Sequence, residues 1–171
     1  MSDFFHGLLK LSQKLPKKRK IGLIKLLSNK KREHFTSQKM NYLNVNVEYF
    51  NVSKKPAIEV LRFLKSGGIM LTFLDIMHPS IKTTNTLFFN RQAKIPCGPT
   101  ELAIASKSII VPLYTHKSKD GEYILTIEDP IDTKLLPRVT FAEKTQIATQ
   151  QLTNCIETWI KQFPEQWEFW W

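Results

Sequence analysis

The stretch LNVNVEY (residues 43–49), followed by PAIEVLRFLKSGG (56–68) and IMLTFL (69–74), decides the fold of this chain. In the first run apolar residues alternate with polar ones, which is the period of a half-buried strand. The second run places Pro56 in a first helical turn, continues with apolar residues at helical spacing and ends on two glycines. The third run is almost wholly apolar, as expected of a strand covered on both faces. This order predicts two parallel strands joined by a crossover helix.

The rest of the chain alternates short strands with helices. A lysine, aspartate and glycine turn between alternating runs predicts a hairpin, and a long apolar stripe predicts a long helix that Pro164 ends. The expected elements are a loop over 75–96 with a short strand at 86–89, a short helix from Gly98, a strand at 108–114, the hairpin turn at 119–121 and a helix over 140–162. The predicted fold class is α/β, with a mixed, mostly parallel sheet flanked by helices.

The composition excludes several classes of protein. With 171 residues, 42% of them hydrophobic, the chain can bury one core and is not disordered as a whole. Cys97 and Cys155 are too few for a disulfide framework and belong to no metal-binding motif, so we expect no metal and no cofactor. No apolar run reaches the roughly 18 residues that would span a bilayer. We therefore expect a cytoplasmic protein that touches a membrane without crossing it.

The positive charge is concentrated near the N-terminus. The formal net charge is +10, and residues 1–34 hold ten of the 25 basic residues against only Asp3 and Glu33. Apolar residues recur at helical spacing over 4–15, so residues 1–40 are predicted to form a basic amphipathic helical segment ahead of a domain at 41–171. Such a segment can lie in a lipid interface with its lysines toward anionic headgroups. Alternatively, it packs on the domain's own core and leaves a solvated basic face.

Five spaced segments of the chain, taken together, carry a family resemblance. They are Gly67-Gly68-Ile69-Met70-Leu71 with Asp75, Phe88-Phe89 through Gly98-Pro99, Val111-Pro112, Gly121-Glu122-Tyr123 and Pro164-Glu165-Gln166-Trp167. This set resembles the distal half of the bacterial lipid A biosynthesis acyltransferases, of the lauroyl and myristoyl type, within the lysophospholipid acyltransferase-like superfamily. The resemblance covers roughly residues 55–168. It implies a glycerolipid acyltransferase-like fold, a peripheral position on the inner membrane face, and acyl transfer from an acyl carrier protein or acyl-CoA thioester to a lipid hydroxyl.

The catalytic pair that the resemblance implies is missing from the sequence. In that family a histidine acts as general base and is followed, after four residues, by Asp or Glu. The fifth positions after the four histidines are Leu11 after His6, Lys39 after His34, Thr83 after His78 and Gly121 after His116. We therefore predict no catalytic residue, and three interpretations stay open.

The first interpretation is a truncated or internally deleted acyltransferase that is inactive alone. The second is a pseudoenzyme or subunit that keeps a lipid-facing surface, with a complementary acyltransferase chain as a possible partner. The third is an active O-acyltransferase whose base is rearranged or supplied by a partner, for which His78 and Asp75 are near neighbours in the sequence.

Four residues are candidates for substrate binding. Asp75 follows a predicted parallel strand, at the edge where open α/β sheets place ligands, and the resemblance puts it in the headgroup region. Gly98 and Pro99 begin a helix whose N-terminus can receive a phosphate or carboxylate, although ordinary turn chemistry explains them equally well. Arg91 flanks that loop and can meet a phosphate, although solvated charge is the commoner explanation. Cys97 as a nucleophile would need a base that the sequence does not reveal.

A non-enzymatic module that binds anionic lipid or nucleic acid is the rival from another class. The basic segment has Phe4, Phe5 and Phe35 close by, and phosphates of either polymer or lipid would attract its lysines. However, these aromatic residues are not arranged on strands as a stacking platform for bases. Bulky apolar residues on the basic helix suit lipid better, so we expect an anionic membrane surface as partner and disfavour nucleic acid.

Overall fold

The computed structural model describes residues 20–25, 47–51, 56–74 and 81–167. The described residues fall into two compact units, one within residues 20–73 and the other within residues 74–167, and each is described by itself. The predicted basic amphipathic helix at 4–15 lies outside the described residues, and the boundary between residues 40 and 41 stays a prediction.

The first unit is a three-stranded parallel sheet with one helix. β1 (Ile21–Lys25) is the central strand, with β2 (Val47–Asn51) on one side and β3 (Ile69–Leu71) on the other. α3 (Pro56–Lys65) connects β2 to β3, so the predicted crossover between parallel strands is confirmed, although β1 lies between the two. The sequence analysis did not anticipate β1, because its five residues lie in a short apolar run among lysines.

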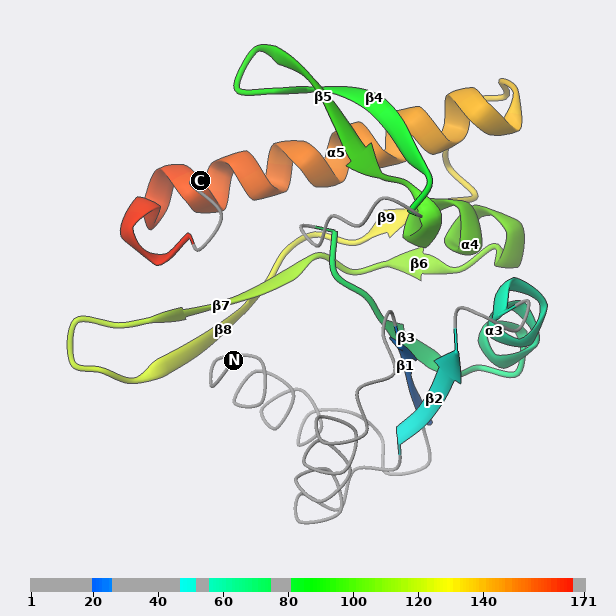
Figure 1. The fold of residues 1–171 in the computed structure, drawn as a ribbon, viewed down its shortest axis with the longest axis horizontal. Coiled ribbons are helices and arrows are strands. Elements are labelled where there is room, and N and C mark those ends of the chain that lie inside the picture. The colour runs from blue at the N-terminus through cyan, green and yellow to red at the C-terminus, as the bar shows by residue number, and fades with distance from the viewer. Residues whose placement is uncertain (1–19, 26–46, 52–55, 75–80, 168–171) are drawn as a thin grey trace. The chain divides into compact units, whose positions relative to one another are not determined.

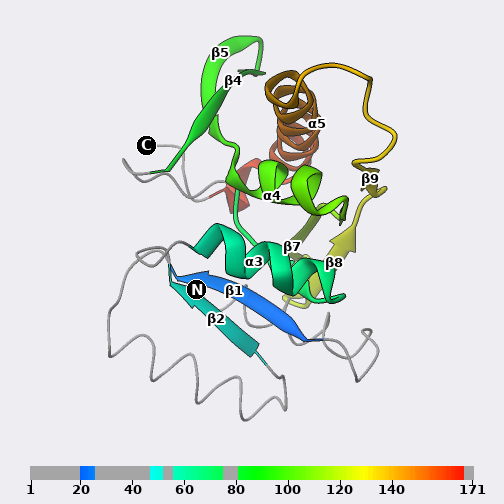
Figure 2. The ribbon, with the colours of Figure 1, turned by 90° about the vertical axis from the view of Figure 1, so that its right-hand side faces the viewer.

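The core of the first unit forms where α3 lies across the sheet (Figure 2). Val60 and Phe63 of α3 and Phe50 of β2 are buried, and the Phe50 and Phe63 rings meet edge to face at 5.2 Å between centroids. Gly22 of β1 leaves room for this packing, since a Cβ there would come within 2.9 Å of both rings. At the end of α3 the N–H of Gly68 donates to the carbonyl of Phe63 at 3.0 Å, so the predicted glycine stop is confirmed.

The second unit contains two helices and three two-stranded antiparallel sheets among its described residues (Figure 1). Its sheets pair β4 with β5, β6 with β9 and β7 with β8. The elements are β4 (Thr83–Phe88), β5 (Arg91–Pro96), α4 (Gly98–Ser106), β6 (Ile109–Ile110), β7 (Leu113–Lys117), β8 (Tyr123–Ile127), β9 (Ile131–Asp132), α5 (Phe141–Gln162) and the 3-10 turn η2 (Pro164–Gln166). The α/β class is confirmed. The prediction of a mostly parallel sheet is wrong, because among the described strands only those of the first unit pair in parallel.

The two hairpins differ in how well they were predicted. The β7–β8 hairpin is confirmed, with Gly121 at a φ of 86° in its turn. The strand expected at 108–114 is divided into β6 and β7 at Val111-Pro112. The β4–β5 hairpin replaces part of the expected loop, and β4 contains residues 86–88 of the short strand expected at 86–89. Phe89 and Asn90 both have positive φ, 48° and 59°, as in the two-residue turn that matches strand twist. Phenylalanine is a rare residue at such a φ, which is why the sequence analysis did not recognise a turn at this position.

α5 begins with a capping box and supports both hairpins. The Thr140 hydroxyl accepts from the Glu143 N–H at 3.3 Å, and the Glu143 carboxylate accepts from the Thr140 N–H at 2.8 Å. The Gln150 side-chain amide pairs with Leu87 of β4, accepting from its N–H at 2.7 Å and donating to its carbonyl at 2.9 Å. Just beyond α5, Gln166 pairs with Lys117 of β7 in the same way, at 2.6 and 3.0 Å. Glutamine side chains thus form hydrogen bonds with backbone N–H and carbonyl groups at the edges of β4 and β7.

Candidate functional site

The strongest candidate site among the described residues is the N-terminus of α4. β5 ends at Pro96, Cys97 is the N-cap, and no side chain caps the helix. The exposed first-turn N–H groups of a helix carry partial positive charge and attract anions. A Cβ built on Gly98 would meet nothing within 4 Å, so a ligand can approach the backbone there. Gly98 and Pro99 are therefore placed together, as the first two residues of α4. The Cys97 N–H already donates to the Lys82 carbonyl at 3.0 Å, Pro99 has no N–H and Thr100 is fully buried, so the N–H of Gly98 is the first-turn donor that an anion could reach most directly.

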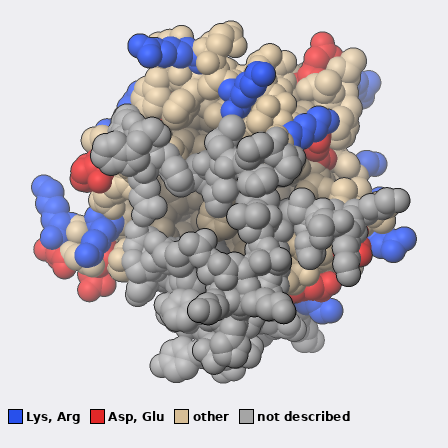
Figure 3. Space-filling view, viewed as in Figure 1, with Lys and Arg blue, Asp and Glu red and all other residues tan. Residues whose placement is uncertain are grey.

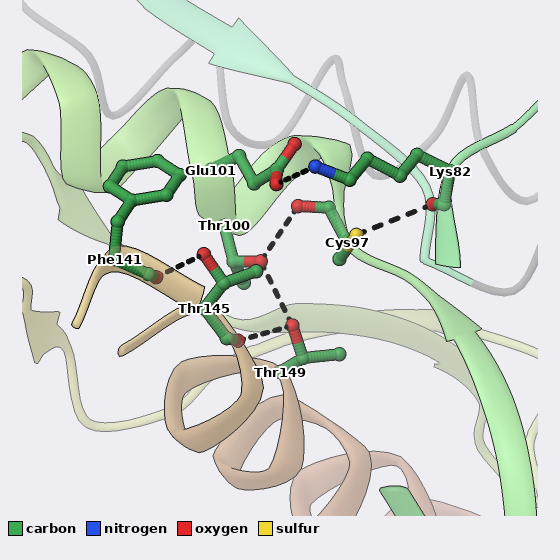
Figure 4. A network of polar contacts seen from close by, with 7 residues as sticks. All are labelled: Lys82, Cys97, Thr100, Glu101, Phe141, Thr145 and Thr149. Carbon is green, nitrogen blue, oxygen red and sulfur yellow. Dashed lines mark hydrogen bonds and ion pairs between the residues drawn. The ribbon is translucent and has the colours of Figure 1, made fainter. Parts of the chain in front are cut away.

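A lysine and a glutamate stand beside this helix terminus (Figure 4). Lys82 precedes β4, and its Nζ lies 2.5 Å from Oε1 of Glu101 in the first turn of α4. The hydrogen bond to Glu101 and then the charge of that carboxylate raise the pKa of Lys82, so its ammonium stays charged. The Lys82 side chain is 71% exposed, which leaves it able to turn toward a ligand. The sequence analysis missed Lys82, because it lies 16 positions before Gly98 and only the pairing of β4 with β5 brings it near.

Cys97 has a structural role at this junction. It is 1% exposed, and its Sγ lies 3.5 Å from the carbonyl oxygen of Lys82. Burial, and then the nearby Glu101 carboxylate, raise the pKa of the Cys97 thiol. A protonated, buried thiol is a poor nucleophile, so the geometry gives no support to covalent chemistry at Cys97.

Threonine hydroxyls hold the first turn of α4 against α5. The hydroxyl oxygens of Thr100 and Thr149 lie 2.9 Å apart, and both residues are fully buried. Thr100 Oγ1 is also 2.8 Å from the Cys97 carbonyl, and Thr149 Oγ1 is 2.7 Å from the Thr145 carbonyl. Each hydroxyl has one proton, so two of these three contacts are hydrogen bonds at any moment. Thr145 in turn donates to the carbonyl of Phe141 at 2.9 Å, so this row of threonine hydroxyls (Thr100, Thr149 and Thr145) extends to the first residue of α5.

Of the other two candidate residues, Arg91 is not joined to this helix terminus and Asp75 is not described. Arg91 pairs with Phe88 at the tip of the β4–β5 hairpin, whereas Pro96 pairs with Thr83 at its base. At about 3.4 Å per strand residue, Arg91 lies roughly 20 Å from Gly98 along the strand. The two residues therefore cannot contact the same phosphate through their backbones. Asp75 lies outside the described residues, and so does His78.

His116 is the one histidine within the described part of the chain, and it lies in an aromatic cluster. Its ring stacks on Phe163 at 4.1 Å and on Tyr114 at 5.5 Å between centroids. Its Nδ1 is buried and has no hydrogen-bond partner among the described residues. A small hollow of about 80 Å³ opens beside it, lined also by Trp159 and Trp167. Among the described residues no carboxylate is hydrogen-bonded to this imidazole, so the geometry seen there does not make it a general base.

Three further observations concern the surface charge, membrane-spanning helices and metal-binding groups. On the face shown in Figure 3, the lysines and arginines of the described residues are interspersed with Asp and Glu rather than gathered in one basic patch. Within the described ranges, no helix is long and apolar enough to cross a bilayer. The same ranges contain no group of three His, Cys, Asp or Glu residues that could hold a metal ion.

The described residues define an α/β protein with one parallel sheet, three antiparallel sheets and a helix, α4, whose N-terminus no side chain caps. A family model described as bacterial lipid A biosynthesis acyltransferase matches residues 24–171. The chain therefore belongs to the bacterial lipid A biosynthesis acyltransferase family, as its sequence motifs predicted. This membership supports an acyltransferase-like function. No curated protein matches the chain.

Proposed function

We propose that this protein is an acyltransferase-like member of its family that binds the anionic headgroup of a lipid acceptor at the first turn of α4 and does not transfer acyl groups alone. The observation that carries the proposal is the uncapped N-terminus of α4, with open space at Gly98 and the Lys82 ammonium beside it. The acyl donor, if a partner chain completes the enzyme, is an acyl carrier protein or acyl-CoA thioester.

Binding at this site combines a fixed and a mobile positive group. The first turn of α4, with the N–H groups of Gly98 and Thr100, is held in place, because the Thr100 hydroxyl contacts both the Cys97 carbonyl and Thr149 of α5. A fixed donor set pays little ordering entropy when an anion arrives. Lys82 then exchanges its carboxylate partner for the ligand, at the cost of the contact with Glu101. Arg91 at the hairpin tip remains a predicted contact to a more distant anionic group, and Asp75 remains a predicted headgroup contact.

The inactivity proposal follows from the chemistry of acyl transfer to a hydroxyl. The acceptor hydroxyl must lose its proton to a base held in place by a second group. None of the four histidines has Asp or Glu at the fifth position after it, and His116 is stacked between aromatic rings instead. The alternative is an active O-acyltransferase whose base is supplied by a partner chain or by His78 with Asp75.

We place the protein at an anionic membrane surface on the cytoplasmic side. Two features support this location, namely the family membership and the ten basic residues within residues 1–34. Lysines near an anionic leaflet are attracted to its surface potential. A non-enzymatic lipid-binding module is the alternative that the same charge pattern favours.

The headgroup site is tested by titrating the whole chain with inorganic phosphate and with glycerol 3-phosphate, while following backbone amide resonances by NMR. We expect saturable shifts at Gly98 and Thr100, and a dissociation constant about three- to fivefold weaker for Lys82→Ala. Lys119→Ala removes an exposed lysine from the β7–β8 turn and is the matched control. Unshifted amides at Gly98 and Thr100, or equal weakening by both variants, would overturn the site.

A further inference from the structure

The loop between β9 and α5 exposes a concentration of large apolar side chains. Leu135 is 83% exposed, Phe141 48% and Val139 40%, all within residues 135–141. Single exposed apolar residues need no explanation, whereas a local group of them indicates an interaction surface. Leu135 is more exposed than any other large hydrophobic residue in the described part of the chain.

Basic side chains alternate with these apolar ones. Lys134 and Arg138 are exposed and Lys144 is partly exposed. The acidic residue of the same stretch, Glu143, is engaged in the capping box with Thr140. Apolar groups interleaved with cations complement an anionic bilayer, where the apolar groups enter the headgroup boundary and the cations meet phosphates. A protein interface would instead be depleted of lysine at its centre.

The loop is held so that Leu135 points away from the core. The Thr133 hydroxyl donates to the Ser108 carbonyl at 2.8 Å, and the Leu135 N–H donates to the Asp132 carbonyl at 3.0 Å. Leu136, the next residue, is buried at 8% exposure and anchors the loop from inside. A surface ordered in advance loses little conformational entropy on binding.

We propose that residues 134–141 insert into the interfacial region of an anionic bilayer, as a membrane contact separate from the predicted N-terminal segment. The inference rests on the membrane location proposed above, but not on the headgroup site. The two surfaces are physically connected, because the row of hydroxyls from Thr100 through Thr149 and Thr145 ends at the Phe141 carbonyl (Figure 4). A bilayer that receives Phe141 therefore lies close to the start of α4.

The first test places an environment-sensitive NBD fluorophore at the loop in the whole chain. Leu135→Cys is labelled in a Cys155→Ser background, since Cys97 is only 1% exposed and escapes the reagent. The control label is at Ile124→Cys on β8, a residue that is 41% exposed. With phosphatidylglycerol vesicles, we expect a blue shift and quenching by lipid-borne quenchers at position 135 and neither at 124. With phosphatidylcholine alone, affinity should fall about fivefold for each cation that contacts lipid.

Three outcomes would overturn the proposal. In the first, the label at 135 reports water while the chain sediments with vesicles, which assigns membrane binding to another segment. In the second, the chain binds no vesicles at all. In the third, the label shifts without lipid as protein concentration rises, which assigns the loop to contact between copies. The phosphate titration at Gly98 contains no lipid, so its failure is distinguishable from each of these results.

A second variant measures the apolar contribution directly. Leu135→Ser, Val139→Ser and Phe141→Ser combined should weaken binding to phosphatidylglycerol vesicles by about tenfold or more, because three side chains no longer leave water. Ile124→Ser with Ile127→Ser removes two comparably exposed residues of β8 and should leave the affinity unchanged. Equal affinities for the two variants, with matching circular dichroism spectra, would contradict the insertion of the loop.

Discussion

At the scale of single residues, we expect the buried hydroxyl of Thr149 to contribute more to stability than the exposed hydroxyl of a threonine on the same helix. Thr149 and Thr158 both lie on α5 and both are placed to donate to the carbonyl four residues before, at 2.7 and 3.0 Å. Only Thr149 is fully buried and also faces Thr100, at 2.9 Å. Its loss leaves buried oxygen atoms with fewer donors than they need.

Thr149→Val should lower the free energy of unfolding by about 1–2 kcal/mol, because the valine keeps the shape and removes the hydroxyl. Thr158→Val is the matched control, since its hydroxyl is exposed and water replaces it. Urea unfolding of both variants checks the prediction. A loss of equal size in the two would mean that the contact with Thr100 contributes nothing.

At the scale of elements, the start of α5 makes stability depend on pH. Hydrogen bonds from the side chain and backbone of Thr140 lower the pKa of Glu143 from its usual value of 4.5. A depressed pKa in the folded state means that the carboxylate stabilises the fold above pH 4.5 and that this contribution is lost as pH falls through the folded pKa.

Glu143→Gln should therefore flatten the decline of stability below pH 4.5, while glutamine can still accept from the Thr140 N–H. Thr140→Ala should flatten it too, because it removes the side-chain hydrogen bond that lowers the pKa. Thermal unfolding between pH 3 and 7 measures the effect. Unchanged pH slopes in both variants would show that the capping box does not perturb Glu143.

The elements that the sequence predicted are those that local signals specify. The long helix has a threonine cap, an apolar stripe and a terminating Pro164, and the structure gives it at Phe141–Gln162. The β7–β8 hairpin has a glycine in its turn, and the crossover helix ends on Gly67-Gly68. In each of these cases the residues that form the element also carry the signal.

The elements that the sequence missed depend on residues far along the chain. β1 is placed between β2 and β3, so its evidence lies in two other strands. At the edge of β4, the backbone of Leu87 is hydrogen-bonded by the side chain of Gln150, which lies 63 residues later in the chain. The candidate site divides in the same way. Gly98 and Pro99 were predicted from their helix, whereas Lys82 joins them only through the strand pairing that ends at Pro96.

At the scale of the whole molecule, the most basic part of the sequence is distant in sequence from the two proposed binding surfaces. Ten of the 25 basic residues lie within residues 1–34, whereas the start of α4 and the loop at 134–141 belong to the second unit. The family match extends over residues 24–171. We propose that the chain keeps lipid-recognition surfaces, whereas none of its four histidines has Asp or Glu at the fifth position after it.

The most direct measurement is an acyl-transfer assay on the purified whole chain, with acyl carrier protein and acyl-CoA thioesters as donors and lipid A precursors as acceptors. The preparation is first shown by NMR to bind phosphate at Gly98, so that it is known to be folded. Our account predicts acceptor binding with no acylated product above the protein-free reaction. Sustained turnover that His78→Ala or Asp75→Ala abolishes would contradict it.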